Sequence, residues 1–300
     1  MPRATPGRWL AVLGWAVLRW AALPCAAQSA VPPVRGGMLV STAWLAAHAK
    51  DPDLVVLHVA DTFADYRRGH IPGARFLATA KFIENGGKLG SELPPVEGLA
   101  KAFGELGVSA KSRVVLYTTA WPPTAARAWF TLDVLGLGDR AALLDGGVEQ
   151  WLAEDRPVTQ ALPAFPPASL EPRARPEARA TLEEVRRALD APGGPSCRLV
   201  DSRPASRFQA GHLPGAANLY WKDTLESDEH PVLLPAEKLR ALLAARGLKP
   251  GTKVVTYCEV GLQASHGYFL LKYLGYDAAM YDGSYQEWSA AKLPVVTGEK

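Results

Sequence analysis

The sequence lacks repeated long apolar runs, has no strong bias toward a few residue types and has little net charge. The first absence excludes a protein with several membrane spans, and the second excludes a collagen-like or disordered chain. Hydrophobic residues make up 48% of the 300 residues and charged residues 21%. This is the composition of an ordinary globular protein, and the length is sufficient for two domains of typical size.

The first 27 residues have the pattern of a secretory signal peptide. Arg3 and Arg8 precede an apolar run at residues 9–18, and small residues follow at Cys25–Ala27. The apolar run is too short to span a bilayer and Arg19 interrupts it, which disfavours a membrane anchor that is not removed. We therefore expect residues 1–27 to be cleaved during export. The mature protein is then expected in the bacterial periplasm, and it is not expected to insert stably into a membrane.

Removal of this leader changes the net charge of the chain. Its three arginines account for the whole formal net charge of +3, so the mature chain is neutral and has no electrostatic feature that favours nucleic acid. A lipid anchor on Cys25 is the alternative to cleavage after the small residues. Pro24, however, stands where a lipidation site needs a small residue.

Two of the three cysteines, Cys197 and Cys258, lie outside the leader. Cys197 precedes the apolar pair Leu199-Val200 and therefore lies at the amino end of an expected strand. Cys258 follows the run Lys253–Tyr257, at a carboxyl end. These are opposite edges of a parallel sheet, so we expect no disulfide between them. We interpret Cys197 as a small, partly buried apolar residue.

The two halves of the chain repeat the same motifs in the same order, which indicates a duplicated domain. The matching segments are Gly69–Ala74 with Gly211–Ala216, Ser112–Tyr117 with Thr252–Tyr257, and Leu144–Gly147 with Tyr281–Ser284. We place the first domain at residues 37–161 and the second at residues 179–298. The segment between them, residues 162–178, contains five prolines and is a linker without a regular helix or central strand.

Within each half, short β-branched runs alternate with helical patterns. Examples are the strand-like residues 54–57 and the helical residues 182–189. Such alternation predicts an α/β fold in which each domain is a parallel sheet flanked by helices. Ligands of these sheets bind at the carboxyl ends of the strands. Cys258 lies at such an end, before a helix expected from Gln263 or Ala264 to Leu274.

This position has a chemical consequence for the thiol. A loop that turns into a helix directs several backbone N–H groups at one point, next to the positive end of the helix dipole. Gly261 permits the sharp turn. We therefore expect a lowered pKa for Cys258 and a nucleophilic thiolate. The alternative is that Cys258 is an inert residue at a strand end.

Three features of the sequence resemble those of the tandem-domain rhodaneses, sulfurtransferases of the thiosulfate and 3-mercaptopyruvate type. They are the Gly-His-Ile/Leu-Pro-Gly-Ala loop in each half, the segment Asp201-Ser202-Arg203 and the loop Cys258–Gln263. The resemblance extends from Met38 to Thr297. It implies two rhodanese-like domains, a catalytic cysteine in the second domain, a non-catalytic first domain and an active site near their interface.

The resemblance also implies roles for individual residues. Cys258 is the expected nucleophile and Arg203 the expected anion clamp, with Arg207 as a weaker second clamp. The expected cradle of the transferred sulfur is the backbone of Glu259, Val260, Gly261, Leu262 and Gln263. Glu259 departs from the family, because many thiosulfate enzymes carry arginine there, and Gln263 stands where arginine, lysine or threonine is more familiar. Both departures leave the identity of the donor open.

The expected reaction has two halves. The Cys258 thiolate takes the outer sulfur of thiosulfate, or the sulfur of 3-mercaptopyruvate, and becomes a persulfide. Cyanide or a thiol then removes that sulfur. Backbone amides stabilise the charge, so neither a metal nor an organic cofactor is expected. An exported thiol faces oxidation, so a reducing partner protein or a steady supply of donor is needed.

The first half of the chain lacks the groups for this chemistry. Thr118 stands where the second half has Cys258, and Pro122 and Pro123 have no N–H to contribute to a cradle. We expect this half to form one wall of the site, with Trp121 near its mouth.

Two rival functions are considered. A related phosphatase has a longer loop that ends in an arginine, and the residues after Cys258 contain no such arginine. The other rival is a non-enzymatic rhodanese-like binding or scaffold protein, which requires an inert Cys258. Labelling with a thiol reagent at mildly acidic pH would distinguish it.

The remaining polar and aromatic motifs have structural interpretations. His70 and His212 lie in turns, where an imidazole most often bonds to the backbone, and no histidine has a zinc-like spacing to a cysteine. The role of His266 stays open. Trp151 and Trp288 occupy matching places and are expected in the core. Both Asp145 and Asp282 precede glycine and are interpreted as turn formers.

Overall fold

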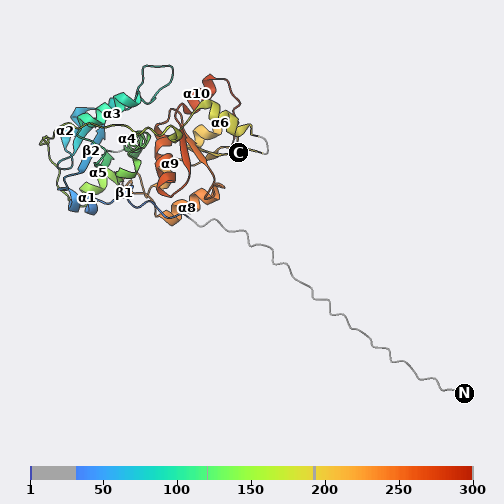
Figure 1. Ribbon diagram of the computed structural model, residues 1–300, viewed down its shortest axis with the longest axis horizontal. Coiled ribbons are helices and arrows are strands. Elements are labelled where there is room, and N and C mark those ends of the chain that lie inside the picture. The colour runs from blue at the N-terminus through green and yellow to red at the C-terminus, as the bar shows by residue number, and fades with distance from the viewer. Residues whose placement is uncertain (2–31, 120, 192–193, 299–300) are drawn as a thin grey trace. The chain divides into compact units, whose positions relative to one another are not determined.

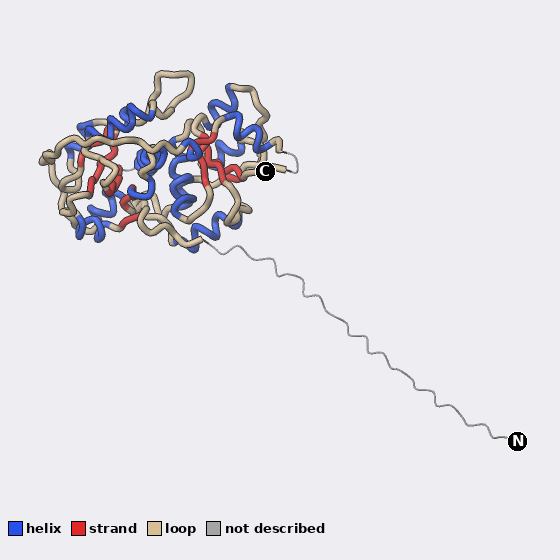
Figure 2. The backbone as a smooth tube through the Cα atoms, viewed as in Figure 1, coloured by secondary structure: helices blue, strands red, loops and turns tan. Residues whose placement is uncertain are grey.

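The computed structural model describes Met1 and residues 32–119, 121–191 and 194–298. The expected leader, residues 1–27, lies outside the described residues apart from Met1. The described chain forms two five-stranded sheets with the same strand order, each with helices on its faces (Figure 2). We call them the first copy, which contains β1 to β5, and the second copy, which contains β6 to β10.

The sheet of the first copy has the order β1-β5-β4-β2-β3, and all its strands are parallel. Its strands are β1 (Leu39–Val40), β2 (Leu54–Ala60), β3 (Arg75–Ala78), β4 (Arg113–Thr118) and β5 (Ala141–Leu144). Its helices are α1 (Thr42–His48), α2 (Phe63–Arg68), α3 (Val96–Glu105), α4 (Pro122–Val134) and α5 (Gly147–Ala153), with short 3-10 helices η1 (Thr79–Lys81) and η2 (Gly138–Arg140).

The second copy repeats this topology in the order β6-β10-β9-β7-β8, again with parallel strands. Its strands are β6 (Arg179–Ala180), β7 (Arg198–Asp201), β8 (Ala217–Asn218), β9 (Val254–Tyr257) and β10 (Ala278–Tyr281). Its helices are α6 (Leu182–Leu189), α7 (Ala205–Ala210), α8 (Ala236–Ala245), α9 (Leu262–Tyr273) and α10 (Ser284–Ala290), with η3 (Pro176–Ala178) and η4 (Trp221–Thr224). The predicted fold class, two parallel sheets flanked by helices, is confirmed.

Local signals in the sequence explain where individual helices begin. The Thr181 hydroxyl accepts a hydrogen bond from the N–H of Glu184 and the Glu184 carboxylate bonds back to the N–H of Thr181, a capping box that starts α6. Helix α9 begins at Leu262, earlier than the expected Gln263 or Ala264. Gly261 has φ 86°, and this left-handed conformation turns the chain directly from the loop into the helix.

The two copies share one hydrophobic core, which lies between helices α4 and α9. The two helices lie side by side in the middle of Figure 1, and the ring of Trp129 from α4 contacts Phe269 from α9 with centroids 5.1 Å apart. The hydroxyl of Tyr268 donates a hydrogen bond to Asp133 Oδ2 at 2.5 Å. Each sheet also has a smaller core on its other face, where Trp151 and Trp288 are 3% and 2% exposed. The copies are therefore packed as one body.

The proline-rich segment between the copies lies along the first copy. The N–H of Ala168 donates to the carbonyl of Gly104, and those of Arg173 and Arg175 donate to the carbonyls of Leu135 and Val134. These bonds satisfy backbone groups that the segment cannot pair within itself. In the described residues, none of the helices has the length and apolar content that crossing a membrane requires.

Candidate functional site

Cys258 lies at the carboxyl end of β9, in the centre of the second sheet. We call residues 258–263 the Cys258 loop. The N–H of Cys258 donates to Ser284 Oγ at 3.1 Å, and its carbonyl accepts from the N–H of Tyr285 at 3.0 Å. The N–H of Gln286 donates to the carbonyl of Glu259 at 3.0 Å. The first turn of α10 therefore holds the loop from one side.

The thiol of Cys258 is buried, with 1% of the residue exposed. Burial raises the pKa of the Cys258 thiol, whereas the backbone N–H groups of Ala264, Val260 and Gln263 act to lower it. Burial is the larger effect, so the prediction of a lowered pKa is wrong for the folded protein. We call these three N–H groups the anion cradle, because each acts to lower the pKa of the thiol and so favours negative charge on the sulfur.

The cradle differs in composition from the predicted set. The amides that act on the sulfur include Val260 and Gln263, as expected, and also Ala264, which was not expected. Leu262 and Gln263 are half-buried in the first turn of α9. Gly261 supplies the turn, and a Cβ on it would lie 2.6 Å from Asp282 Oδ1. The backbone of the loop thus depends on this glycine.

Arg203 is buried beside the loop, and its guanidinium already has protein partners. Nε and Nη2 donate to the carboxylate of Asp201, with Nη2 at 2.7 Å from Oδ2. Nη2 also donates to the carbonyl of Gly211, and Nη1 donates to Glu259 Oε2 at 3.0 Å. All three guanidinium nitrogens therefore donate to protein oxygens. This arrangement does not favour the predicted role of Arg203 as an anion clamp.

The two other charged residues of the predicted site, Glu259 and Arg207, are exposed. The Glu259 side chain is 52% exposed and pairs with Arg203, so it does not face the sulfur as an unpaired carboxylate. Arg207 is exposed near the end of the short helix α7. Its predicted role as a second clamp stays a prediction.

The first copy contributes a buried arginine to the support of the Cys258 loop. Arg127, on α4, is 0% exposed and donates from Nη1 to Asp282 Oδ1 at 2.5 Å and from Nη2 to the carbonyl of Ser91. Asp282 in turn lies against Gly261. Asp282 is therefore more than the predicted turn former, because it joins Arg127 to the loop.

A second contact between the copies covers the outer side of the loop. The N–H of Gly90 donates to Gln286 Oε1 at 2.8 Å, and a Cβ on Gly90 would lie 3.6 Å from a methyl group of Val260. The ring of Trp121 meets the edge of Trp221, with centroids 6.4 Å apart. The first copy thus forms part of the wall around the site.

The histidines have the following positions. His70 Nδ1 and Nε2 bond to the carbonyls of Tyr66 and Ala161, and His212 Nδ1 bonds to the carbonyl of Phe208. His266 is buried on α9, and its Nε2 lies 2.8 Å from Thr224 Oγ1. Burial lowers the pKa of His266 to about 4. His266 is therefore neutral at physiological pH and bonded to a hydroxyl.

Sequence reasoning missed Arg127, Ser284 and Ala264. Arg127 lies in a helix that starts with two prolines, and its partner Asp282 is 155 residues away. No local pattern indicates such a pair. In the described part of the chain, no group of three or more His, Cys, Asp or Glu side chains could hold a metal ion.

Comparisons with known proteins agree with this architecture. The family model for the rhodanese-like domain matches residues 41–154 and 181–291. A thiosulfate sulfurtransferase of Corynebacterium glutamicum is 32% identical, with 87% of this chain and 91% of the relative covered. The sulfur carrier protein TtuD of Thermus thermophilus is 32% identical, with 88% and 98% covered.

A 3-mercaptopyruvate sulfurtransferase of Escherichia coli is 28% identical to this chain, with 85% of this chain and 96% of the relative covered. The crystal structure of SseA from Escherichia coli, described as a 3-mercaptopyruvate sulfotransferase with the rhodanese fold, is similar with a TM-score of 0.73 at 27% identity. It covers 82% of this chain and 98% of that one.

Substitutions of Arg127 and Asp282, which form a buried ion pair, should have non-additive effects on the free energy of unfolding. Arg127→Met would leave the buried carboxylate of Asp282 with only its longer contact, at 3.5 Å, to the partly exposed Arg179, so we expect the free energy of unfolding to fall by about 3 kcal/mol. Urea unfolding of Arg127→Met, Asp282→Asn and the double variant should give a coupling energy above about 1 kcal/mol.

A matched control is available on the surface. The side chains of Lys81 and Glu105 pair at 3.7 Å and are 58% and 51% exposed. Lys81→Met should change the free energy of unfolding by less than about 1 kcal/mol. Additive effects of the two buried substitutions would contradict the assigned pair.

Proposed function

Because this chain belongs to the rhodanese-like domain family and carries two copies of the domain, we propose that it is a sulfurtransferase that carries a transferred sulfur on Cys258. The observation that carries this proposal is the buried thiol at the end of β9, where the N–H groups of Val260, Gln263 and Ala264 favour negative charge on the sulfur. The first copy has Thr118 at the matching strand end. Only the second copy therefore offers a nucleophile at this place.

In the first half of the proposed reaction, the Cys258 thiolate attacks the sulfur of the donor. With thiosulfate, a new S–S bond forms, the S–S bond of thiosulfate breaks, and sulfite leaves with the electron pair. With 3-mercaptopyruvate, the C–S bond breaks, and the enolate of pyruvate leaves and takes a proton from water. In both cases Cys258 becomes a persulfide. The cradle amides stabilise the negative charge on its outer sulfur.

In the second half, an acceptor removes that outer sulfur. Cyanide attacks it and leaves as thiocyanate, and the electrons of the broken S–S bond return to Cys258 as the thiolate. A thiol acceptor would leave as a persulfide in the same way. Two separate transfers through one covalent intermediate should give ping-pong kinetics.

The charges around the loop favour one of the two donors. Asp201 and Glu259 contribute two carboxylates, and Arg203, which bonds to both, contributes one positive charge. The surroundings therefore keep a net negative charge, which opposes a donor with two negative charges more than a donor with one. We infer that 3-mercaptopyruvate, a monoanion with its thiol protonated, is preferred over the dianion thiosulfate.

The alternative, a non-enzymatic scaffold, has one observation in its favour. Cys258 is 1% exposed and burial raises the pKa of its thiol, so slow labelling by a thiol reagent would not distinguish a scaffold from an enzyme. Direct detection of the persulfide makes the distinction instead.

The place of action in the cell is proposed from the sequence alone. The arginines and the apolar run of residues 1–27 support export to the periplasm. In that oxidising compartment, a reducing partner protein would keep Cys258 available between turnovers.

The proposed function predicts a mass change that depends on one residue. The full chain, incubated with thiosulfate or with 3-mercaptopyruvate, should gain the mass of one sulfur atom and should lose it when cyanide is added. Cys258→Ser should show no gain, because no thiolate remains at the cradle. Intact-mass spectrometry of the folded protein measures both steps.

Cys197→Ser is the matched control for this experiment. Cys197 is also buried and free, but it lies at the amino end of β7, at the opposite edge of the sheet. This variant should load sulfur as the unmodified protein does. A folded protein that gains no sulfur from either donor would support the scaffold instead.

The raised pKa of Cys258 predicts a dependence of sulfur loading on pH. Below the pKa of a thiol, each pH unit changes the thiolate fraction about tenfold. The charge of thiosulfate is constant near neutrality, so the single-turnover rate of persulfide formation should rise about tenfold per unit between about pH 6 and about pH 8. Acid quenching followed by mass spectrometry gives this rate. A rate independent of pH over that range would show that the thiol is already ionised.

A further inference from the structure

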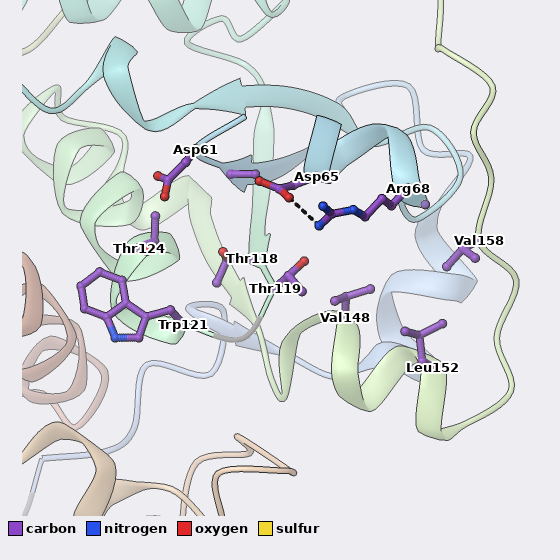
Figure 3. Close-up of a pocket in the computed structure, with 12 residues that line it drawn as sticks. Asp61, Asp65, Arg68, Thr118, Thr119, Trp121, Thr124, Val148, Leu152 and Val158 are labelled. Carbon is purple, nitrogen blue, oxygen red and sulfur yellow. Dashed lines mark hydrogen bonds and ion pairs between the residues drawn. The ribbon is translucent and has the colours of Figure 1, made fainter. Parts of the chain in front are cut away.

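The first copy contains an open cavity at the carboxyl ends of its central strands. Its volume is about 630 Å³, within the range of small-molecule sites. Figure 3 shows the cavity between the end of β4, the start of α4 and the helices α2 and α5. Its walls include Asp61, Asp65, Arg68, Thr118, Thr119, Trp121, Thr124, Val148, Leu152 and Val158.

The cavity lies at the point of the sheet where ligands of such folds bind. In the order β1-β5-β4-β2-β3, strands β2 and β4 are neighbours. After β2 the chain continues to β3 at one edge of the sheet, and after β4 it continues to β5 in the opposite direction. The crevice between β2 and β4 is therefore a topological switch point. The equivalent crevice of the second copy, between β7 and β9, holds Asp201 and Cys258.

The two crevices differ in whether the matching aspartate has a positively charged partner. Asp201 is paired with Arg203, two residues later. Asp61 stands at the same place in the first copy, and two residues later the chain has Phe63, which is 45% exposed. Asp61 is exposed and accepts a hydrogen bond from Thr79 Oγ1 at 2.7 Å. Among the described residues it has no cationic partner, so its negative charge stays uncompensated.

The other charges of the cavity do not change this balance. Asp65 and Arg68 neutralise each other in an ion pair at 2.8 Å, drawn as a dashed line in Figure 3. The helix that begins at the crevice starts with Pro122 and Pro123, which have no N–H groups to offer an anion. The cavity therefore keeps one net negative charge and disfavours anions such as the proposed sulfur donors.

The cavity also has polar groups available to a ligand. Thr118 and Thr124 are each 8% exposed and line the cavity. Each hydroxyl has one O–H donor and lone pairs that accept hydrogen bonds, so a polar group of a ligand can bond to this wall of the cavity.

The remaining wall is apolar. Val148, Leu152 and Val158 lie along one side, and Trp121 lies across the cavity from them (Figure 3). An aromatic ring next to a carboxylate is a favourable surface for an organic cation, because the ring face attracts positive charge. We propose that the cavity binds a small organic monocation, an amine with an apolar body, with its ammonium group at Asp61. This site does not depend on the proposed sulfur transfer.

Titration calorimetry of the full chain tests the site with three amines of different apolar bodies: 2-phenylethylamine, cyclohexylamine and octylamine. At least one amine should bind with one-to-one stoichiometry. Asp61→Asn should weaken that binding at least about tenfold, because a charge-assisted hydrogen bond is lost. 3-Phenylpropionate, an anion of similar size, should not bind.

Three variants keep the test specific. Asp53→Asn removes another exposed carboxylate, at the amino end of β2 and outside the cavity, and should leave binding unchanged. Leu152→Arg places a positive charge on the cavity wall, where the side chain is half exposed, and should abolish amine binding. Cys258→Ser should bind the amine as the unmodified protein does, which separates this site from the sulfur chemistry.

Three outcomes would overturn the inference. They are no binding of any of the three amines, equal binding of the anion, and binding that survives both Asp61→Asn and Leu152→Arg. Each would show that the cavity does not select an organic cation.

Discussion

The buried ion pair between Arg127 and Asp282 is the interaction on which the site most depends. Asp282 lies against Gly261, so the carboxylate that pairs with the first copy also limits the space behind the Cys258 loop. A buried charge without its partner is costly. The first copy therefore helps to hold the loop in place through this pair. The shared core between α4 and α9 keeps the two partners of this pair in place.

The two copies of the fold differ in a few side chains at matching positions of their crevices. At one strand end, Thr118 replaces the thiol of Cys258, and the following prolines remove N–H donors. At the neighbouring strand, Phe63 replaces Arg203 and leaves Asp61 without its positive partner. The result is one crevice with an anion cradle and a second crevice with negative charge. The same topology thus presents different groups to a ligand in the two copies.

Much of the fold was predictable, because the signals for it are local and repeated. The motifs shared by the two halves indicated a duplicated parallel sheet, and the β-branched run before Cys258 placed the thiol at a carboxyl strand end. The pKa of that thiol was not predictable, since burial depends on packing between distant segments. For the same reason nothing in the sequence indicated that Arg203, the expected anion clamp, has protein partners, whereas folding brings Glu259 and the carbonyl of Gly211 to it.

The most direct test of the account is a crystal structure of the full chain after incubation with 3-mercaptopyruvate. The account predicts one additional sulfur atom on Cys258 Sγ, within hydrogen-bond distance of the N–H groups of Val260, Gln263 and Ala264, with the pair of Arg127 and Asp282 intact behind it. An added sulfur on Cys197, or a Cys258 that remains unmodified while pyruvate is released, would contradict the central claim that this cradle holds the transferred sulfur.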